Sequence, residues 1–187
     1  MSDVLSLFRQ SGALHEGHFR LSSGLHSSGY LQCALVLQHP AHAETLGSAL
    51  GDLLRDLNAT VVLSPALGGL IIGHEVARGL GVRAIFAERQ DNVLTLRRGF
   101  SLSADDRVVI IEDVVTTGGS TRETMVVARD TGATVVGAGS IIDRSAGAAT
   151  LDAPFRALVA LSLPTYELGS CPMCASGQPV TKPGSRG

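Results

Sequence analysis

The chain has 187 residues, enough for one domain with a full hydrophobic core, with or without a small addition. A formal net charge of −2 and the absence of tryptophan give no support for a nucleic-acid or membrane partner. No apolar run reaches the ~20 residues of a membrane span, and the first residues lack the pattern of a signal peptide. Three cysteines are too few for a disulfide framework, so we expect a cytoplasmic protein.

The first elements are short. Residues 4–8, with Leu14 after them, have the apolar spacing of a short amphipathic helix. In residues 17–32, Phe19, Leu21 and Tyr30 alternate with polar residues, which predicts two short strands around a Ser/Gly turn. Residues 41–58 then predict a longer helix.

A strand, a loop and a helix follow. Residues 61–63 are an apolar strand, residues 64–69 read SPALGG, and residues 70–80 predict a helix with Gly81 as its C-cap. Glycines in such a loop let the backbone approach a ligand closely, although a tight turn needs small residues too. Residues 83–87 predict the next strand. The polar stretch after it carries Arg89, Arg97 and Arg98 and is either a lid or a solvated hairpin.

The most informative stretch is residues 108–121, which read VVIIEDVVTTGGST. Four consecutive β-branched residues predict a strand buried on both faces. Glu112 and Asp113 come next, then hydroxyls and glycines, and then a helix that Ser120 or Thr121 could cap. A glycine-rich turn at a helix start suits a phosphate, whereas the carboxylates suit hydroxyl groups or magnesium. The pattern therefore indicates a sugar phosphate site.

The rest of the chain completes an α/β fold. Residues 134–144 predict a strand that ends at Asp143 and Arg144, and the arginine could be an exposed ion-pair partner or a clamp for a carboxylate. Residues 155–161 predict a final strand. We expect a Rossmann-like parallel sheet of about five strands flanked by helices, in a single domain spanning residues 1–187. Its core would cover about 39–151, its hood about 1–38 and 152–170, and its flexible tail 171–187.

Residues 108–120 resemble the binding motif of the type I phosphoribosyltransferases, in which two acidic residues precede a short loop of threonine and glycine. Within that family, residues 19–31, 64–69 and 142–144 resemble the hood, the pyrophosphate loop and the base-binding arginine of the enzymes that use orotate. The resemblance covers nearly the whole chain. It implies Mg²⁺-dependent transfer of 5-phosphoribosyl from phosphoribosyl pyrophosphate to orotate, giving orotidine 5-phosphate for pyrimidine (UMP) biosynthesis.

The resemblance also implies roles for individual residues. Those expected to bind phosphoribosyl pyrophosphate are Leu67, Gly68, Gly69, Arg89, Glu112, Asp113, Val114, Val115, Thr116, Thr117, Gly118, Gly119 and Ser120. Those expected to bind orotate are Thr116, Arg144, Tyr30 and Leu31, and Phe19 would close over the base with the hood. Arg89 and Asp113 are the expected catalytic residues. Magnesium would be bound mainly through phosphoribosyl pyrophosphate, so no residue is assigned as its ligand, and we expect a homodimer.

The chain departs from the family pattern in its cations. Ser22 and Gly68 stand where many orotate enzymes have lysines, the mobile loop is short, and Lys182 is the only lysine. We hypothesise that the three arginines of residues 89–98 take over the leaving-group role, in their own site or across a dimer interface.

Two alternatives and one motif stay open. The chain could be a purine or uracil phosphoribosyltransferase, or a regulator that senses phosphoribosyl pyrophosphate. Cys171 and Cys174 have the CxxC spacing of half a zinc site, but no second half is evident, and two ordinary thiols are the favoured interpretation. His26 is either a cation of the site or a structural residue.

Overall fold

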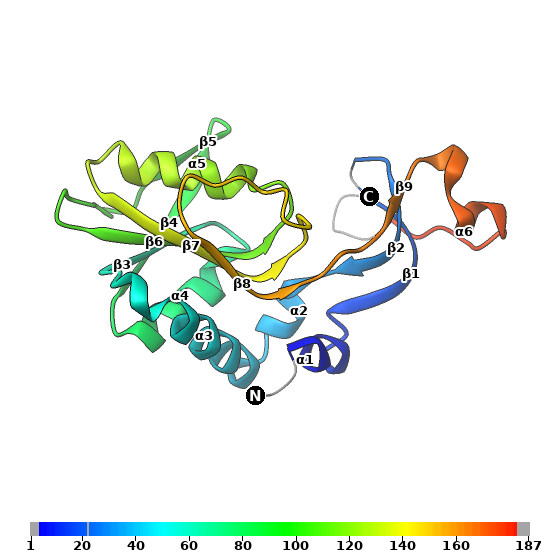
Figure 1. Ribbon diagram of the computed structural model, residues 1–187, viewed down its shortest axis with the longest axis horizontal. Coiled ribbons are helices and arrows are strands. Elements are labelled where there is room, and N and C mark those ends of the chain that lie inside the picture. The colour runs from blue at the N-terminus through cyan, green and yellow to red at the C-terminus, as the bar shows by residue number, and fades with distance from the viewer. Residues whose placement is uncertain (1–3, 22, 183–187) are drawn as a thin grey trace. The chain divides into compact units, whose positions relative to one another are not determined.

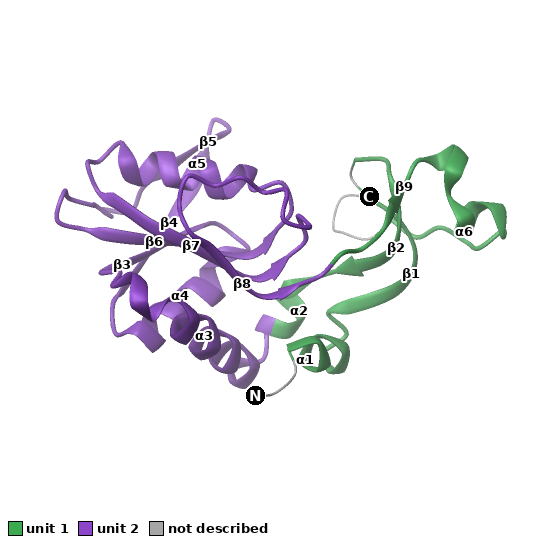
Figure 2. Cartoon of the chain, in the orientation of Figure 1, with its two compact units in different colours: residues 1–36, 162–187 green, residues 37–161 purple. Residues whose placement is uncertain are grey.

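The computed structural model describes residues 4–21 and 23–182. The chain divides into two compact units (Figure 2). The smaller unit combines Met1–Val36 with Ser162–Gly187, and the larger unit is Leu37–Leu161. Both terminal segments therefore belong to the same unit.

The smaller unit contains a three-stranded sheet in the order β1-β2-β9. β1 and β2 are antiparallel, with Arg20 opposite His26, and β9 adds to β2 with Tyr166 opposite His26. The two strands expected within residues 17–32 are thus present, although β1 already begins at Leu14. The elements are α1 (Val4–Gln10), β1 (Leu14–Arg20), β2 (His26–Leu31), β9 (Thr165–Tyr166), a 3-10 turn (Leu168–Ser170) and α6 (Pro172–Ala175). α2 (Cys33–Leu37) follows β2.

The structure differs from the flexible tail expected over residues 171–187. Residues 172–175 form α6, and Thr181 forms a bridge with Phe19 of β1. The N–H of Thr181 donates to the carbonyl of His18 (2.8 Å), and the N–H of Arg20 donates to the carbonyl of Thr181 (2.9 Å). Glycine and proline in this segment shape turns that return it to β1. Residues 183–187 of the expected tail lie outside the described residues.

The larger unit is built on a six-stranded sheet in the order β5-β4-β3-β6-β7-β8 (Figure 1). Five strands are parallel, and β5 pairs antiparallel with β4 at the edge. The expected parallel sheet of about five strands flanked by helices is confirmed. Its elements are α3 (Pro40–Leu54), a 3-10 turn (Arg55–Leu57), β3 (Val61–Pro65), α4 (Gly69–Leu80), β4 (Arg83–Gln90), β5 (Val93–Leu96), β6 (Arg107–Val115), α5 (Gly119–Arg129), β7 (Thr134–Asp143) and β8 (Phe155–Ala160).

β8 lies in this sheet, although we had expected residues 152–170 in the hood. It pairs in parallel with β7, with Phe155 beside Ala138 and Val159 beside Ile142. An apolar strand satisfies its backbone best by adding to an open sheet edge, and β7 provides that edge. The sequence pattern identified the strand but could not assign its partner.

The apolar residues of β6 are buried on both faces of the sheet. Val108 and Ile110 belong to a core cluster with Met125 of α5. Ile111 faces the other way, where it lies with Leu54 of α3 around Gly139. α3 and α4 cover one face and α5 covers the other (Figure 1). This two-sided burial explains why the strand reads as an unbroken apolar run.

The order of the strands determines where a ligand can bind. β3 lies between β4 and β6, with Val61 beside Arg83 on one side and beside Val108 on the other. The chain passes from β3 through α4 to β4, and the next parallel strand, β6, lies on the opposite side of β3. Helices that leave neighbouring strands in opposite directions open a crevice at the carboxyl ends of those strands. That point falls between β3 and β6.

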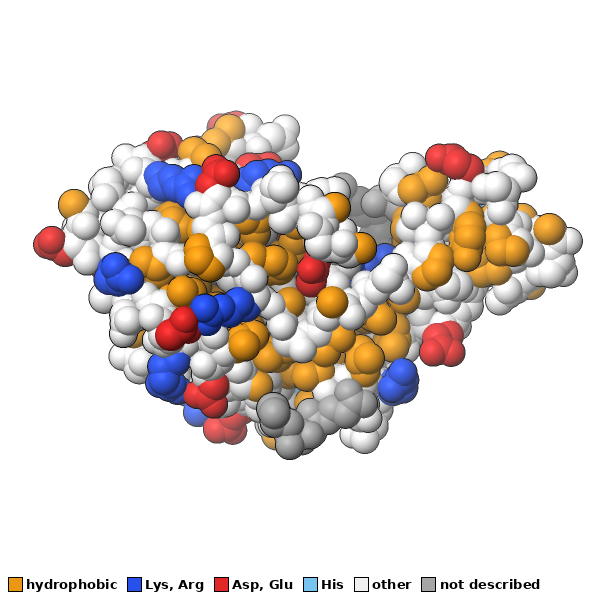
Figure 3. All heavy atoms as spheres, viewed as in Figure 1, with side chains coloured by type: hydrophobic (Ala, Val, Ile, Leu, Met, Phe, Trp, Pro, Cys, Tyr) orange, Lys and Arg blue, Asp and Glu red, His pale blue; other side chains and the backbone are white. Residues whose placement is uncertain are grey.

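The surface of the larger unit carries basic and acidic side chains beside one another on the face drawn in Figure 3. Arg156 donates to Asp56, and Arg129 lies 3.7 Å from Asp152. Exposed pairs of this kind contribute about 0–1 kcal/mol each, so the unit depends on its core instead. Among the described residues, no helix combines the length and apolar character needed to cross a membrane.

Two buried glycines of α3 give a prediction about how α3 packs on α4. A Cβ on Gly47 would lie 2.3 Å from the Cβ of Glu75, whereas a Cβ on Gly51 would lie 3.6 Å from its nearest neighbour, the carbonyl oxygen of Val76. Gly47→Ala should therefore separate the helices and lower the free energy of unfolding by about 1–3 kcal/mol. Gly51→Ala should leave it unchanged or raise it by up to ~1 kcal/mol, because alanine favours helix.

Urea denaturation of both variants checks this prediction. Gly51→Ala is the matched control, since both positions are buried in the same helix. Equal effects of the two substitutions would contradict the close approach at Gly47.

Candidate functional site

The loop after β3 approaches β6 closely because it has no side chain at Gly68. The loop runs from Pro65 through a cis peptide between Ala66 and Leu67 to Gly69, the first residue of α4. A Cβ on Gly68 would lie 2.8 Å from a carboxylate oxygen of Asp113. Glycine therefore lets the loop backbone lie against that carboxylate without displacing it.

The loop after β6 ends at the N-terminus of α5. Gly118 is the N-cap residue, with a left-handed φ of +74° that favours glycine, and α5 begins at Gly119. We had expected Ser120 or Thr121 to cap this helix. That prediction was wrong, because the helix begins earlier and its N-cap has no side chain. The first N–H groups of α5, together with the positive end of its dipole, remain suited to an anion.

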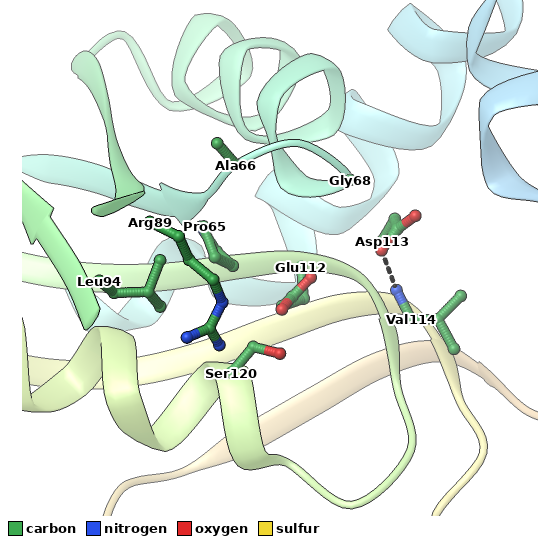
Figure 4. A pocket seen from close by; sticks show the side chains of 9 residues that line it. All are labelled: Pro65, Ala66, Gly68, Arg89, Leu94, Glu112, Asp113, Val114 and Ser120. Atoms are coloured by element: carbon green, nitrogen blue, oxygen red, sulfur yellow. Dashed lines mark hydrogen bonds between the residues drawn. The ribbon is translucent and has the colours of Figure 1, made fainter. Parts of the chain in front are cut away.

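A pocket of about 270 Å³ lies between these two loops (Figure 4). Its walls are mostly polar. Figure 4 shows the side chains of Arg89, Glu112 and Ser120 directed toward one another, with Asp113 beside Gly68. The lining residues are Pro65, Ala66, Gly68, Arg89, Leu94, Glu112, Asp113, Val114 and Ser120.

The structure brings only part of the predicted set to this pocket. Of the residues expected to bind phosphoribosyl pyrophosphate, Gly68, Arg89, Glu112, Asp113, Val114 and Ser120 line it. The others lie in the same two loops or in the strand and helix ends that border them: Leu67, Gly69, Val115, Thr116, Thr117, Gly118 and Gly119. Leu67 is 82 % exposed at the tip of its loop. Leu94 of β5 was missed, because a buried leucine in a hairpin arm carries no signal of a binding role.

The two carboxyl groups lie in an environment that disfavours their ionised forms. Burial, and then the charge of Asp113, raises the pKa of Glu112 to about 8, although the N–H of Asp113 and the hydroxyl of Ser120 oppose the shift. Burial also raises the pKa of Asp113, against the N–H of Val114, which lies 2.8 Å from its Oδ1. Glu112 is 8 % exposed. A ligand that donates hydrogen bonds, or a cation, would favour ionisation of this pair.

The arginines of residues 89–98 have different surroundings. Arg89 lines the pocket, and its guanidinium donates to the carbonyl of Asn92 and to the carboxylate of Glu123 on α5, both at 2.7 Å. Arg98 instead donates to Glu88 at 2.7 Å and holds the pKa of that carboxyl below its usual range. Among the pocket residues that the structure describes, Arg89 is the cationic one. The leaving-group role of Arg97 and Arg98 stays a prediction.

The residues expected to bind orotate come from both units. Val115 pairs with Asp143, so Thr116 and Arg144 leave β6 and β7 at the same level of the sheet. The N–H of Arg144 donates to the carbonyl of Val115 at 2.7 Å. Tyr30 and Leu31 lie at the end of β2 in the smaller unit, where the ring of Tyr30 is 6.0 Å from that of Phe19. Ser22 lies outside the described residues.

Comparisons with known proteins agree on one family. The phosphoribosyl transferase domain family matches residues 34–165. A protein of Pelotomaculum thermopropionicum named orotate phosphoribosyltransferase is 50 % identical, covering 98 % of this chain and 97 % of its own. One of the same name from Caldanaerobacter subterraneus is 48 % identical, covering 98 % and 96 %. The crystal structure of orotate phosphoribosyltransferase from Aeropyrum pernix is 26 % identical, with a TM-score of 0.70 over 85 % of this chain and 94 % of that one.

The raised pKa of Glu112 predicts how stability depends on pH without ligand. Its folded-state pKa of about 8 lies above the model-peptide value of 4.5, so the folded protein binds the extra proton between these limits. The free energy of unfolding should therefore fall as pH rises from about 5 to 8. Glu112→Gln should remove this slope and stabilise the protein by roughly 1–3 kcal/mol at pH 8.

Urea denaturation at pH 5.5, 7 and 8.5 measures the slope. Glu167→Gln, which changes an exposed glutamate, is the control and should keep the wild-type slope. A wild-type slope unaffected by Glu112→Gln would show that another group titrates in this range.

Proposed function

The chain belongs to the orotate phosphoribosyltransferases, and from that premise we propose that the pocket between β3 and β6 transfers 5-phosphoribosyl from phosphoribosyl pyrophosphate to orotate. The products are orotidine 5-phosphate, a precursor of UMP, and pyrophosphate. The observation that carries the proposal is the meeting of a buried and a half-buried carboxyl group with a helix N-terminus and a glycine loop in one pocket. The hydroxyls of a sugar phosphate would bind the carboxyl groups, and its phosphates would bind the helix N-terminus and the glycine loop.

The carboxyl groups bind the ribose ring. The 2- and 3-hydroxyls donate hydrogen bonds to Glu112 and Asp113, and these bonds stabilise the ionised forms that burial disfavours. Binding therefore lowers the pKa of the pair and releases a proton from Glu112 at neutral pH. The hydrogen bonds from the ribose hydroxyls thus offset the free-energy cost of ionising the two carboxyl groups in the pocket. This makes the pair suited to recognition of a diol.

The two loops hold the phosphates. The 5-phosphate accepts hydrogen bonds from the loop of residues 116–120 and interacts with the positive end of the α5 dipole. The pyrophosphate lies against residues 67–69, where Gly68 leaves the backbone open. Arg89 reaches the same pocket and can exchange its pairing with Glu123 for the leaving group.

Orotate binds where β6 and β7 end. Arg144 can hold its carboxylate through two parallel hydrogen bonds, and Thr116 lies at the same level, between the base and the phosphate loop. The contribution expected from Tyr30 and Leu31 comes from the smaller unit and stays a prediction. A carboxylate-bearing base uses an arginine that a purine or uracil does not need, which favours orotate.

The reaction breaks the bond between the anomeric carbon and the pyrophosphate oxygen, and it forms a bond to a ring nitrogen of orotate, which releases its proton to solvent or to the departing pyrophosphate. Pyrophosphate leaves with the electron pair, and the sugar becomes oxocarbenium-like between the two. Arg89 neutralises charge on the departing group, while the carboxylates hold the ring and face developing positive charge. Positioning of both substrates supplies much of the rate.

Magnesium fits this pocket. Its preferred ligands are oxygens, and a pair of carboxyl groups whose pKa values are raised by burial is relieved by a nearby cation. Glu112 and Asp113 are the residues beside which Mg²⁺ would lie, bound mainly through phosphoribosyl pyrophosphate. When bound, it supplies charge neutralisation of the pyrophosphate.

The proposal extends to assembly and location. A homodimer is supported by an apolar groove on the larger unit, lined by Leu70, Ala84, Ile85 and Phe86, near the 45 % exposed Ile71. A cytoplasmic location is supported by three cysteines that form no disulfide among the described residues. Light scattering on the purified protein measures the mass in solution.

A panel of bases tests the function. Protein, Mg²⁺ and phosphoribosyl pyrophosphate are mixed separately with orotate, adenine, hypoxanthine and uracil, and pyrophosphate release is measured. We expect release with orotate alone. Release with a purine or with uracil would instead establish the first alternative, and release with none would favour a sensor of phosphoribosyl pyrophosphate.

Substitution of the arginines tests the leaving-group assignment. Arg89→Ala should lower kcat by about 10²-fold, because it removes a positive charge that faces the departing pyrophosphate. Arg55→Ala is the control, because Arg55 is exposed and pairs with Asp52, outside the pocket and outside residues 89–98. It should leave kcat unchanged. An unchanged kcat in Arg89→Ala would rule out the role proposed for it.

A further inference from the structure

Four potential metal ligands gather in the smaller unit, in a place that the proposed reaction does not use. They are His18 of β1, His26 of β2, and Cys171 and Cys174 at either end of the α6 turn. One ligand atom from each lies within 4.8 Å of all the others. The sequence showed the CxxC pair but no further ligands to complete a zinc site. In the structure two histidines, more than 140 positions earlier in the chain, lie beside the two cysteines.

We propose that these four side chains form a structural zinc site of the Cys₂His₂ type. Two thiolates and two imidazoles are the ligands of closed tetrahedral zinc sites, and a soft S₂N₂ set selects zinc over magnesium or calcium. All four side chains belong to the smaller unit, and none of them lines the pocket between β3 and β6.

The distances fit tetrahedral coordination. Zn–S bonds of about 2.3 Å and Zn–N bonds of about 2.0–2.1 Å place sulfur and nitrogen ligands roughly 3.6 Å apart. The Sγ of Cys171 and of Cys174 lie 3.6 and 3.7 Å from Nε2 of His18, and the Sγ of Cys174 lies 3.3 Å from Nδ1 of His26. The two ring nitrogens are 2.6 Å apart, so a zinc ion requires them to separate by about 0.7 Å.

A hydrogen bond outside the cluster orients His18. Its Nδ1 lies 2.8 Å from the carbonyl oxygen of Gln178, so Nδ1 carries the proton and donates it. The lone pair of Nε2 is then directed at the two sulfurs. A carbonyl that fixes the tautomer of a histidine in this way is characteristic of metal-bound histidines. The N–H of Gln178 in turn donates to the carbonyl of Met173, which ties this partner to the α6 turn.

The turn that carries the cysteines has the compact backbone of a metal-binding knuckle. The N–H of Ala175 donates to the carbonyl of Cys171, and that of Gly177 donates to the carbonyl of Cys174. Gly177 has a φ of +71°, which reverses the chain. His18, His26 and Cys171 are 3–4 % exposed, so the cluster is closed to solvent on most sides, as structural zinc sites are.

A bound zinc ion would stabilise the smaller unit, whose hydrophobic core is small. Among its described residues, the buried apolar side chains are Phe8, Ala13, Leu31, Cys33, Val36 and Cys171. So small a core contributes little stability, and units of this size usually add a metal or a disulfide. Zinc binds after the two thiols release their protons, and it joins segments that are far apart in the chain.

Metal content tests the proposal on the full chain, produced without a metal-binding tag. We expect one zinc per chain after purification in reducing buffer, measured by mass spectrometry of the elements. Protein that is stripped, reduced, mixed with equimolar Zn²⁺ and desalted should recover it. Co²⁺ in place of Zn²⁺ should give the intense visible bands of tetrahedral thiolate coordination. Failure of the reduced wild-type protein to retain zinc would overturn the proposal.

Matched variants locate the site. Cys174→Ser and His18→Ala should weaken zinc binding at least 10-fold. Cys33→Ser, which removes another buried thiol of the same unit, and His15→Ala, which removes another histidine of β1, should retain it. Zinc loss equal in ligand and control variants would place the metal elsewhere and overturn the assignment. If the ligand variants do not fold, wild-type retention and the Co²⁺ spectrum decide.

Discussion

The structure of the larger unit depends on where β6 stops being buried. After Arg107 at its start, the apolar residues 108–111 fill both faces of the sheet, so the next polar side chains of the strand appear only toward its carboxyl end. There the carboxyl groups of Glu112 and Asp113 lie close together beside Gly68, where burial leaves little water to solvate their charges. Such a pair costs stability in the free protein. A diol or a cation beside the pair would favour its ionised form, so under the proposed function the crowding that destabilises the free pocket also makes it selective.

Under the proposed function, the chain binds phosphates mainly through its backbone. Gly68 and Gly118 each place a residue without a side chain in one of the two loops: a Cβ on Gly68 would meet Asp113, and Gly118 has a positive φ. Under the proposed function, N–H groups and the α5 dipole bind the 5-phosphate. The proposal leaves Arg89 for the pyrophosphate and Arg144 for the carboxylate of the base. A fixed backbone costs less entropy to orient than a long side chain.

Local sequence was enough to predict the parts of the fold that depend on local physics. The buried strand at residues 108–111 and the turns after β3 and β6 were predicted correctly, because burial and turn chemistry leave local patterns, although the cap of α5 was placed too late in the chain. The other errors arise where residues distant in the sequence pair with one another. The strand at residues 155–160 was assigned to the hood because its apolar pattern does not say which edge it joins. Leu94 enters the pocket only because β5 folds back on β4.

The cluster of His18, His26, Cys171 and Cys174 shows the same limit most clearly, since 153 positions separate His18 from Cys171. A link between positions so distant removes more conformational freedom from the unfolded chain than a local link does, and metal bound by the folded form adds its own free energy. His26 begins β2, and the Tyr30 and Leu31 expected at the orotate site end it. The strand that the metal would anchor is thus the strand that carries those side chains. Loss of the metal should therefore affect orotate binding more than binding of phosphoribosyl pyrophosphate, whose expected residues lie in the larger unit.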